Sequence, residues 1–206
     1  MALRLLPLMM AAAPVSPSPV GFYQAHQMEV GAALELKKDG HFRYQLDYGA
    51  VSEQAEGDWT FDGKTVRLTS NPMPKEPSFE LVRDDPAPPG DLVMILEPPG
   101  FGEGYRLDAV AVDAVSGEKG LVTAGEGGRV DAGGHKLASI DPLVPVYGTT
   151  GGHFVLSEDR GHRLLLRFHA NDLGKAALRG EPLTITFSDL LLNRYDAEIR
   201  FVRVRP

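Results

Sequence analysis

The chain has 206 residues, of which 43% are hydrophobic and 24% are charged, and its formal net charge is −7. This is the composition of a globular protein long enough for one large or two small cores. It argues against nucleic-acid binding, because that affinity comes largely from neutralising phosphates and this chain is mildly acidic. Three arginines near the C-terminus are interpreted as the solvated face of a last strand (Arg200, Arg203 and Arg205).

The first residues have the pattern of an export signal. Arg4 supplies a positive start, residues 5–13 (LLPLMMAAA) are apolar, and small residues and prolines follow. We expect residues 1–19 to be a signal peptide or a disordered leader of a periplasmic or secreted protein; the alternative is a disordered tail of a cytosolic one. The apolar run is shorter than the roughly 20 residues of a membrane span, and no later segment approaches that length. No integral membrane segment is therefore expected in the mature chain.

Glycine and proline punctuate short β-like runs along the rest of the chain, which contains 23 Gly, 16 Pro and no Cys. Such spacing is typical of a β-sandwich or barrel. An exported fold without disulfides must be stabilised by core burial alone. The best helical candidate is residues 171–179 (NDLGKAALR), which predict one short helix or a helical turn.

Residues 30–36 and 42–48 each alternate apolar with polar or small side chains, with Gly40 in the turn between them. A two-residue loop would place the two apolar sets on opposite faces of the hairpin. A three-residue loop opposes Leu36 to Phe42 and keeps both sets on one face, so this register is predicted. Gly40 then occupies the left-handed position of the loop.

The next hairpin turns at Asp62-Gly63, a pair that favours a two-residue type I′ turn. This register opposes Trp59 to Val66, and residues 51–61 form the strand that joins the two hairpins. Four consecutive antiparallel strands with one apolar face form a meander, which is half of a barrel or one sheet of a sandwich.

Later strands are expected between Pro-rich linkers, with a domain boundary near residue 85. A third hairpin is predicted from residues 153–157 and 163–169. The chain is divided into three parts: a leader (1–19), the β meander (20–84) and a β-sandwich-like domain (85–206).

Catalytic and metal-binding patterns are missing from the sequence. None of the six histidines has metal-ligand spacing. His153 and His169 face opposite sides of their predicted hairpin with a four-residue loop and are neighbours with a three-residue loop, and a metal would still need a third ligand. Without a Gly-x-Ser-x-Gly motif or a cysteine there is no recognisable nucleophile. No catalytic residue, metal or cofactor is predicted.

The aromatic face of the meander has two interpretations. Its side chains form either a packed core with tyrosine hydroxyls at the rim or the lining of a ligand cavity. In the second case the ligand-binding residues are Tyr44, Tyr48 and Trp59.

Three segments carry a family resemblance: Gly21-Phe22-Tyr23, LELKKDGHFRY (34–44) and EGDWTFDGKTVRLTS (56–70). They resemble the opening of lipocalin-like bacterial envelope proteins, in which a Leu-x-Leu strand pairs with an Asp-Gly-x-Phe strand before a Gly-x-Trp strand. The resemblance covers roughly residues 20–70. It implies a periplasmic or secreted β-barrel-like module and carries over no site residue.

We therefore expect an all-β protein, an antiparallel meander (a lipocalin-like barrel or half-barrel) followed by a β-sandwich-like region. The leading functional hypothesis is non-catalytic binding of a small apolar ligand or an envelope partner. The second is a structural or interaction module that uses an exposed strand edge, and a hydrolase is third. An enclosed apolar pocket above about 300 Å³, lined by the face of Tyr44, Tyr48 and Trp59, would favour binding of a small ligand in a cavity, and a filled core there would argue against it.

Overall fold

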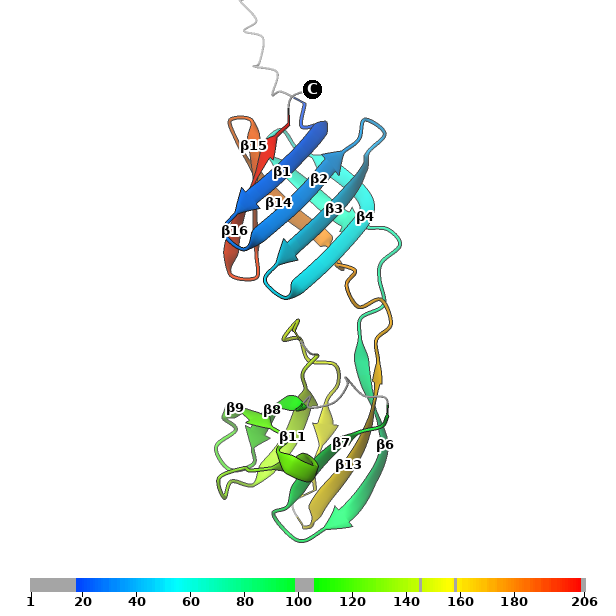
Figure 1. Cartoon of the computed structure of the whole chain (residues 1–206), viewed down its shortest axis with the longest axis vertical. Coiled ribbons are helices and arrows are strands. Elements are labelled where there is room, and N and C mark those ends of the chain that lie inside the picture. The colour runs from blue at the N-terminus through cyan, green and yellow to red at the C-terminus, as the bar shows by residue number, and fades with distance from the viewer. Residues whose placement is uncertain (1–17, 99–105, 145, 158, 205–206) are drawn as a thin grey trace, which may run out of the picture.

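The computed structural model describes residues 18–98, 106–144, 146–157 and 159–204. Residues 1–17 of the predicted leader lie outside the described residues. Figure 1 shows two β structures, a barrel that carries both ends of the described chain and a smaller sandwich joined to it by two linkers. The predicted all-β class is confirmed, and the meander is a closed barrel rather than a half-barrel.

The barrel has eight antiparallel strands in up-and-down order, closed by pairing of the first strand with the last. Each strand pairs with its neighbours in the chain, except that an insertion separates the fifth strand from the sixth. The strands are β1 (Gly21–Gln27), β2 (Val30–Leu36), β3 (His41–Tyr48), β4 (Val51–Phe61), β5 (Thr65–Ser70), β14 (Arg179–Thr186), β15 (Asp189–Arg194) and β16 (Ala197–Arg203).

The residues between β5 and β14 form two four-stranded sheets that share one core. One sheet has the order β10-β7-β13-β6, with β7 and β13 parallel. Its strands are β6 (Ser78–Ala87), β7 (Leu92–Leu96), β10 (Arg129–Val130) and β13 (Gly161–His169). The other sheet has the order β12-β11-β8-β9, from β8 (Asp108–Asp113), β9 (Lys119–Thr123), β11 (Leu137–Pro142) and β12 (Phe154–Val155). A 3₁₀ turn, η1 (Glu126–Gly128), precedes β10.

The arrangement of the chain differs from the three-part division of the sequence. Residues 179–203, assigned there to the sandwich, supply three of the eight barrel strands. The sandwich is thus inserted into the barrel rather than attached after it. Local alternation shows that a strand has an apolar face, but it carries no information on which core receives that face.

The register of the first hairpin is confirmed. Leu36 lies opposite Phe42, and Leu34 lies opposite Tyr44. Gly40 has a φ of 86°, in the region that favours glycine.

The predicted register of the second hairpin is wrong by two residues. Phe61, not Trp59, lies opposite Val66. The Asp62 carboxylate accepts hydrogen bonds from the N–H groups of Lys64 and Thr65, at 2.9 and 2.8 Å. Asp62 therefore opens the turn instead of occupying its centre. Because the shift is two residues, the same set of side chains still faces the barrel interior.

Two other local predictions differ from the structure. Residues 171–179 form two successive turns, closed by Leu173 N–H to Ala170 O and Lys175 N–H to Asp172 O, and no helix. β12 and β13 do not form a hairpin, because they belong to different sheets. The chain crosses there from one layer of the sandwich to the other.

The barrel interior is filled with side chains. Its core contains buried apolar residues from seven of the eight strands, and partly buried side chains of β4 pack against them. The largest core side chains are almost completely buried (Tyr23, Phe42, Phe201, Leu34, Leu36, Leu46 and Leu68). Ala176 and Leu178 of the returning linker enter the same core. Because the interior is packed, a ligand site on the barrel is expected on its flank or at its ends.

Candidate functional site

The structure places the three predicted ligand-binding residues apart, each with its own packing role. Tyr44 points into the barrel core and donates a hydrogen bond to Glu53. Trp59 is half-buried beside the turn between β2 and β3, where its Nε1–H donates to Lys37 O at 3.0 Å. Tyr48 packs against the core near the opposite end of the barrel, opposite Val51. Of the three, only Tyr44 belongs to the lining of the groove described below.

A buried carboxylate locks the end of the barrel that faces the sandwich. Glu53 of β4 has only 3% of its surface exposed. The Arg194 guanidinium binds both of its oxygens, at 2.6 Å to Oε2 and through a short contact to Oε1. The hydroxyls of Tyr44 and Tyr195 donate to the same carboxylate at 2.9 and 2.8 Å. All of its acceptor positions are therefore engaged.

The same cluster shifts the pKa of its phenols. Burial, together with the hydrogen bond and charge of Glu53, raises the pKa of Tyr195 to about 12. Burial and then Glu53 raise the pKa of Tyr44 further above its usual value. For Arg194, burial lowers the pKa but the hydrogen bond and charge of Glu53 outweigh it, so the net pKa is raised. The cluster is a stable ion pair with neutral phenols, which suits a structural role.

The sandwich reaches this end of the barrel through one loop. The hydroxyl of Tyr147, between β11 and β12, donates to the backbone oxygen of Ser52 at 2.7 Å. Burial and the charge of Glu53 both raise the pKa of Tyr147. This bond links the two β structures at a second place besides the linkers.

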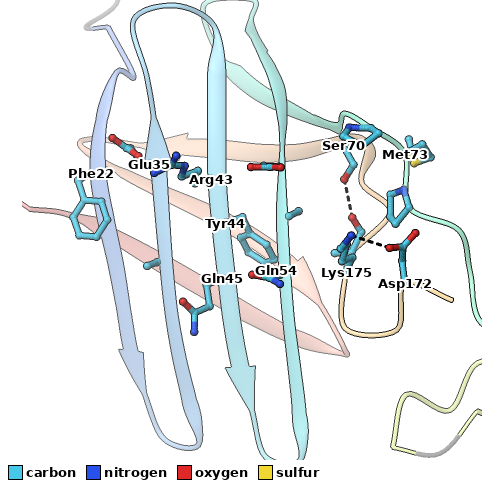
Figure 2. A pocket seen from close by; sticks show the side chains of 16 residues that line it. Phe22, Glu35, Arg43, Tyr44, Gln45, Gln54, Ser70, Met73, Asp172 and Lys175 are labelled. Carbon is cyan, nitrogen blue, oxygen red and sulfur yellow. Dashed lines mark hydrogen bonds and ion pairs between the residues drawn. The ribbon is translucent and has the colours of Figure 1, made fainter. Parts of the chain in front are cut away.

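The outer flank of the barrel carries a groove of about 800 Å³. Figure 2 shows its floor, the outward face of β1 to β4. Two rows of side chains cross the strands. One row contains Phe22, Glu35, Arg43 and Glu56, each directly opposite the next. The other contains Ala33, Gln45 and Gln54.

Two linkers form one wall of the groove (Figure 2). The outgoing linker contributes Pro72, Met73 and Pro74, and the returning linker contributes Asp172, Lys175 and Ala176. Tyr44, Ala55 and Ser70 complete the lining.

Hydrogen bonds hold this wall in place. The Lys75 N–H donates to the Asp172 carboxylate at 2.9 Å, and the Asp172 N–H donates back to Lys75 O at 3.1 Å. The returning linker pairs with β4 through Gln54 N–H to Gly174 O at 2.9 Å and Ala176 N–H to Gln54 O at 2.8 Å. The groove is thus built from the barrel and from the point where the insertion joins it.

Charges in the groove nearly balance. Lys175 pairs with Asp172 at 2.8 Å, within the wall. Arg43 lies between two carboxylates, Glu35 on one neighbouring strand and Glu56 on the other. The site therefore offers hydrogen-bond donors and acceptors without a strong net field.

The sandwich contains a buried histidine with a carboxylate partner. His162 Nδ1 lies 2.9 Å from Asp84, which also binds Arg160. Its Nε2 lies 3.1 Å from the backbone nitrogen and 3.1 Å from the backbone oxygen of Ser157. Although an Asp-His pair is part of many catalytic triads, here the second ring nitrogen is used by the backbone. His162 therefore holds the segment around Ser157, which connects the two sheets of the sandwich.

The other histidines on the sandwich bind single carboxylates. His153 pairs with Asp141 at 2.5 Å and His169 pairs with Glu80 at 2.8 Å, on different sheets. They are therefore not cross-strand neighbours. Within residues 18–98, 106–144, 146–157 and 159–204, no group of three His, Asp or Glu side chains is placed to hold a metal ion.

Apart from Tyr44, the residues that line the groove were not predicted from the sequence, although part of the signal was available. The confirmed register of β2 and β3 places Glu35, Arg43 and Gln45 on the outward face. Outward polar residues are the ordinary feature of a β-barrel, so they did not indicate a site. The wall of the groove comes from linkers about 100 residues apart.

Over the described residues, no α-helix has the length and apolar character that a membrane span requires. Comparison of the chain with protein-family models, curated proteins and solved structures gives no match.

Proposed function

We propose that this chain is an exported, non-catalytic binding protein of the cell envelope, with a lipocalin-like barrel that holds its ligand or partner on its flank. One observation carries this proposal: the barrel interior is filled, whereas the flank groove is open and measures about 800 Å³. A concave site with a few well-placed polar groups is the usual setting for a ligand.

The buried ionisable groups support binding rather than catalysis. Glu53 is saturated by Arg194 and two tyrosines, and both ring nitrogens of His162 are engaged. A general acid or base needs a free position toward the substrate. Neither group has one, which makes a hydrolase the weaker hypothesis.

Export is supported by the sequence. The positive, apolar and then small-residue pattern of residues 1–19 is that of a secretory signal. The resemblance of residues 20–70 to lipocalin-like envelope proteins points to the same compartment. The confirmed register of β2 and β3 lies within that segment.

Native mass spectrometry of the protein purified from its own cell envelope tests the proposal. We expect extra mass that disappears on denaturation. Ala33→Trp places a large ring on the groove floor and should abolish the extra mass, whereas Thr184→Trp, on the exposed face of β14, should keep it. Equal loading of both variants would place the ligand elsewhere and overturn the groove as the site.

A protein-interaction module is the second candidate. The outward face of the sheet β12-β11-β8-β9 exposes Leu121 (68%) and Val155 (77%). Apolar side chains on an open sheet are a feature of partner-binding surfaces. Absence of any extra mass in the same experiment would favour this candidate.

A further inference from the structure

We propose that the flank groove binds an uncharged, hydroxyl-rich oligosaccharide chain that lies across strands β1 to β4. This inference rests on the proposed function, since it names the ligand class of the same groove. It follows from the length of the groove, its balance of charge and the positions of its apolar side chains.

The length of the groove favours an extended ligand. Phe22 and Glu56 belong to one row that crosses four strands. Neighbouring strands are separated by about 4.8 Å, so three spacings place the two ends about 14 Å apart. Gln54 also bridges to Lys175, which extends the second row by one more spacing. A chain of several sugar units matches this span, and a single small metabolite would occupy only part of it.

The polar groups of the groove match hydroxyls better than ions. Gln45 and Gln54 lie directly opposite each other, and each amide both donates and accepts hydrogen bonds. Arg43 adds donors, and its flanking carboxylates add acceptors. A sugar hydroxyl also donates and accepts, so it can use both kinds of group. An anion would be repelled by Glu35 and Glu56, and a cation would compete with Arg43.

The two large exposed apolar side chains of the lining lie at its opposite ends (Figure 2). Phe22 of β1 is 42% exposed, and Met73 of the outgoing linker is 38% exposed. An exposed ring can pack against the apolar face of a sugar, as aromatic side chains pack against other flat surfaces. A fatty acyl chain would need a continuous apolar floor, but the side chains of Arg43, Gln45 and Gln54 interrupt the floor between these two residues (Figure 2).

The closed barrel makes a peptide strand a poorer fit. Peptides that add to sheets use unpaired backbone groups at an edge. In the barrel β1, β2 and β3 each have a strand on both sides, and the start of β4 pairs with the returning linker. The groove therefore offers side chains and no strand edge.

Titration of the ¹⁵N-labelled mature protein with defined probes tests this inference by NMR. The probes are chitotetraose, cellotetraose and maltotetraose, with glucose, sodium dodecanoate and a neutral hexapeptide for comparison. We expect at least one tetrasaccharide to shift amides of residues 22, 33–35, 43–45 and 54–56 with submillimolar affinity. Glucose should bind at least tenfold more weakly, because it fills only part of the groove.

Matched variants locate the binding. Phe22→Ala and Gln54→Ala should each weaken tetrasaccharide binding by about tenfold or more, the loss expected from one good contact of roughly 1.4 kcal/mol. Phe187→Ala should leave it unchanged, because this ring is 93% exposed at the hairpin between β14 and β15, outside the groove. The ¹⁵N spectra also show whether each variant is folded.

Failure of this inference can be distinguished from failure of the proposed function. If dodecanoate or the hexapeptide shifts the amide signals of the groove residues and no tetrasaccharide does, the inference is overturned. The groove then remains a binding site for another class of ligand. If no probe shifts the amide signals and Ala33→Trp and Thr184→Trp carry equal amounts of ligand, both the inference and the proposed function of the groove are overturned. Tetrasaccharide binding that is unaffected by Phe22→Ala and Gln54→Ala would also overturn the inference.

Discussion

The barrel and the inserted sandwich differ in how their strand edges are protected from pairing with other chains. Every barrel strand has a neighbour on each side, so closure leaves no unpaired row of backbone groups. The sandwich has four outer strands, of which β10 and β12 are only two residues long. The long edge strand β6 changes register beside Leu81 and continues into the charged residues Arg83, Asp84 and Asp85. Bulges and charges of this kind discourage pairing with other chains.

The two regions also differ in how far apart in sequence their paired strands lie. In the barrel, hairpins follow one another and only the β5–β14 and β1–β16 pairs are distant. In the sandwich, β13 lies between β6 and β7, and it pairs with one antiparallel and with the other parallel. Short-range pairing is readable from local patterns, whereas long-range pairing depends on which strands reach one another. The insertion between β5 and β14 therefore leaves the pairing of the barrel strands around it intact.

The largest expected effect is the loss of the barrel's buried ion pair. Glu53→Ala leaves the Arg194 guanidinium without its acceptor, and breaking such a buried pair costs about 3–5 kcal/mol. Urea unfolding followed by the fluorescence of Trp59, the single tryptophan, reports this loss from within the barrel. The double variant Glu53→Leu/Arg194→Met removes both partners and should recover most of the stability. A loss below about 1 kcal/mol in Glu53→Ala would contradict the role of the cluster.

Two glycines allow the same change to be made in each region. A Cβ on Gly57 would lie 2.1 Å from Thr69 O in the barrel, and a Cβ on Gly161 would lie 2.0 Å from Pro88 O in the sandwich. Each alanine variant should lose about 1–3 kcal/mol of stability, as overpacked sites do. If the regions unfold separately, calorimetry will show each variant lowering a different transition. Gly31→Ala meets no atom within 4 Å and serves as the control; a single shared transition in every variant would show one cooperative unit.

The hydrogen bond between the barrel and the sandwich should contribute less to the free energy of unfolding. Tyr147→Phe removes the hydrogen bond to Ser52 O, which is worth about 0.5–1.5 kcal/mol. A contact between two units stabilises only the first one to unfold, because it is already lost when the second unfolds. The first calorimetric transition should therefore fall while the second stays in place. Movement of both transitions by similar amounts would contradict a contact that is lost when the first region unfolds.

A last effect on stability is absent at neutral pH and appears only at alkaline pH. The pKa of Tyr195 is raised to about 12 from its usual value near 10, so the folded state keeps a proton that the unfolded state loses. This contribution to stability is complete below pH 10 and is lost as the pH rises toward 12. Tyr195→Phe should flatten the decline in the unfolding midpoint over that window. Absorbance of tyrosinate at 295 nm measures the ionisation directly, and ionisation of all tyrosines near pH 10 would contradict the shift.

Much of the barrel follows from the sequence. The alternation of residues 30–36 and 42–48 determines the hairpin register, because a one-residue slip would expose the whole apolar set. The same alternation places Glu35, Arg43 and Gln45 outward, so the floor of the candidate site was already implied. The second hairpin was not determined, since registers two residues apart bury the same face and only the hydrogen bonds of Asp62 choose between them.

Tertiary structure alone decided where the insertion begins and ends, and with it the candidate site. Barrel closure requires strands from residues 179–203 beside β1 and β5, and no local pattern identifies that pairing. The same closure brings Arg194 to Glu53 across 141 residues and sets the returning linker beside β4. Side-chain alternation acts over a few residues, whereas a groove between a sheet and two distant linkers exists only once the chain has closed on itself.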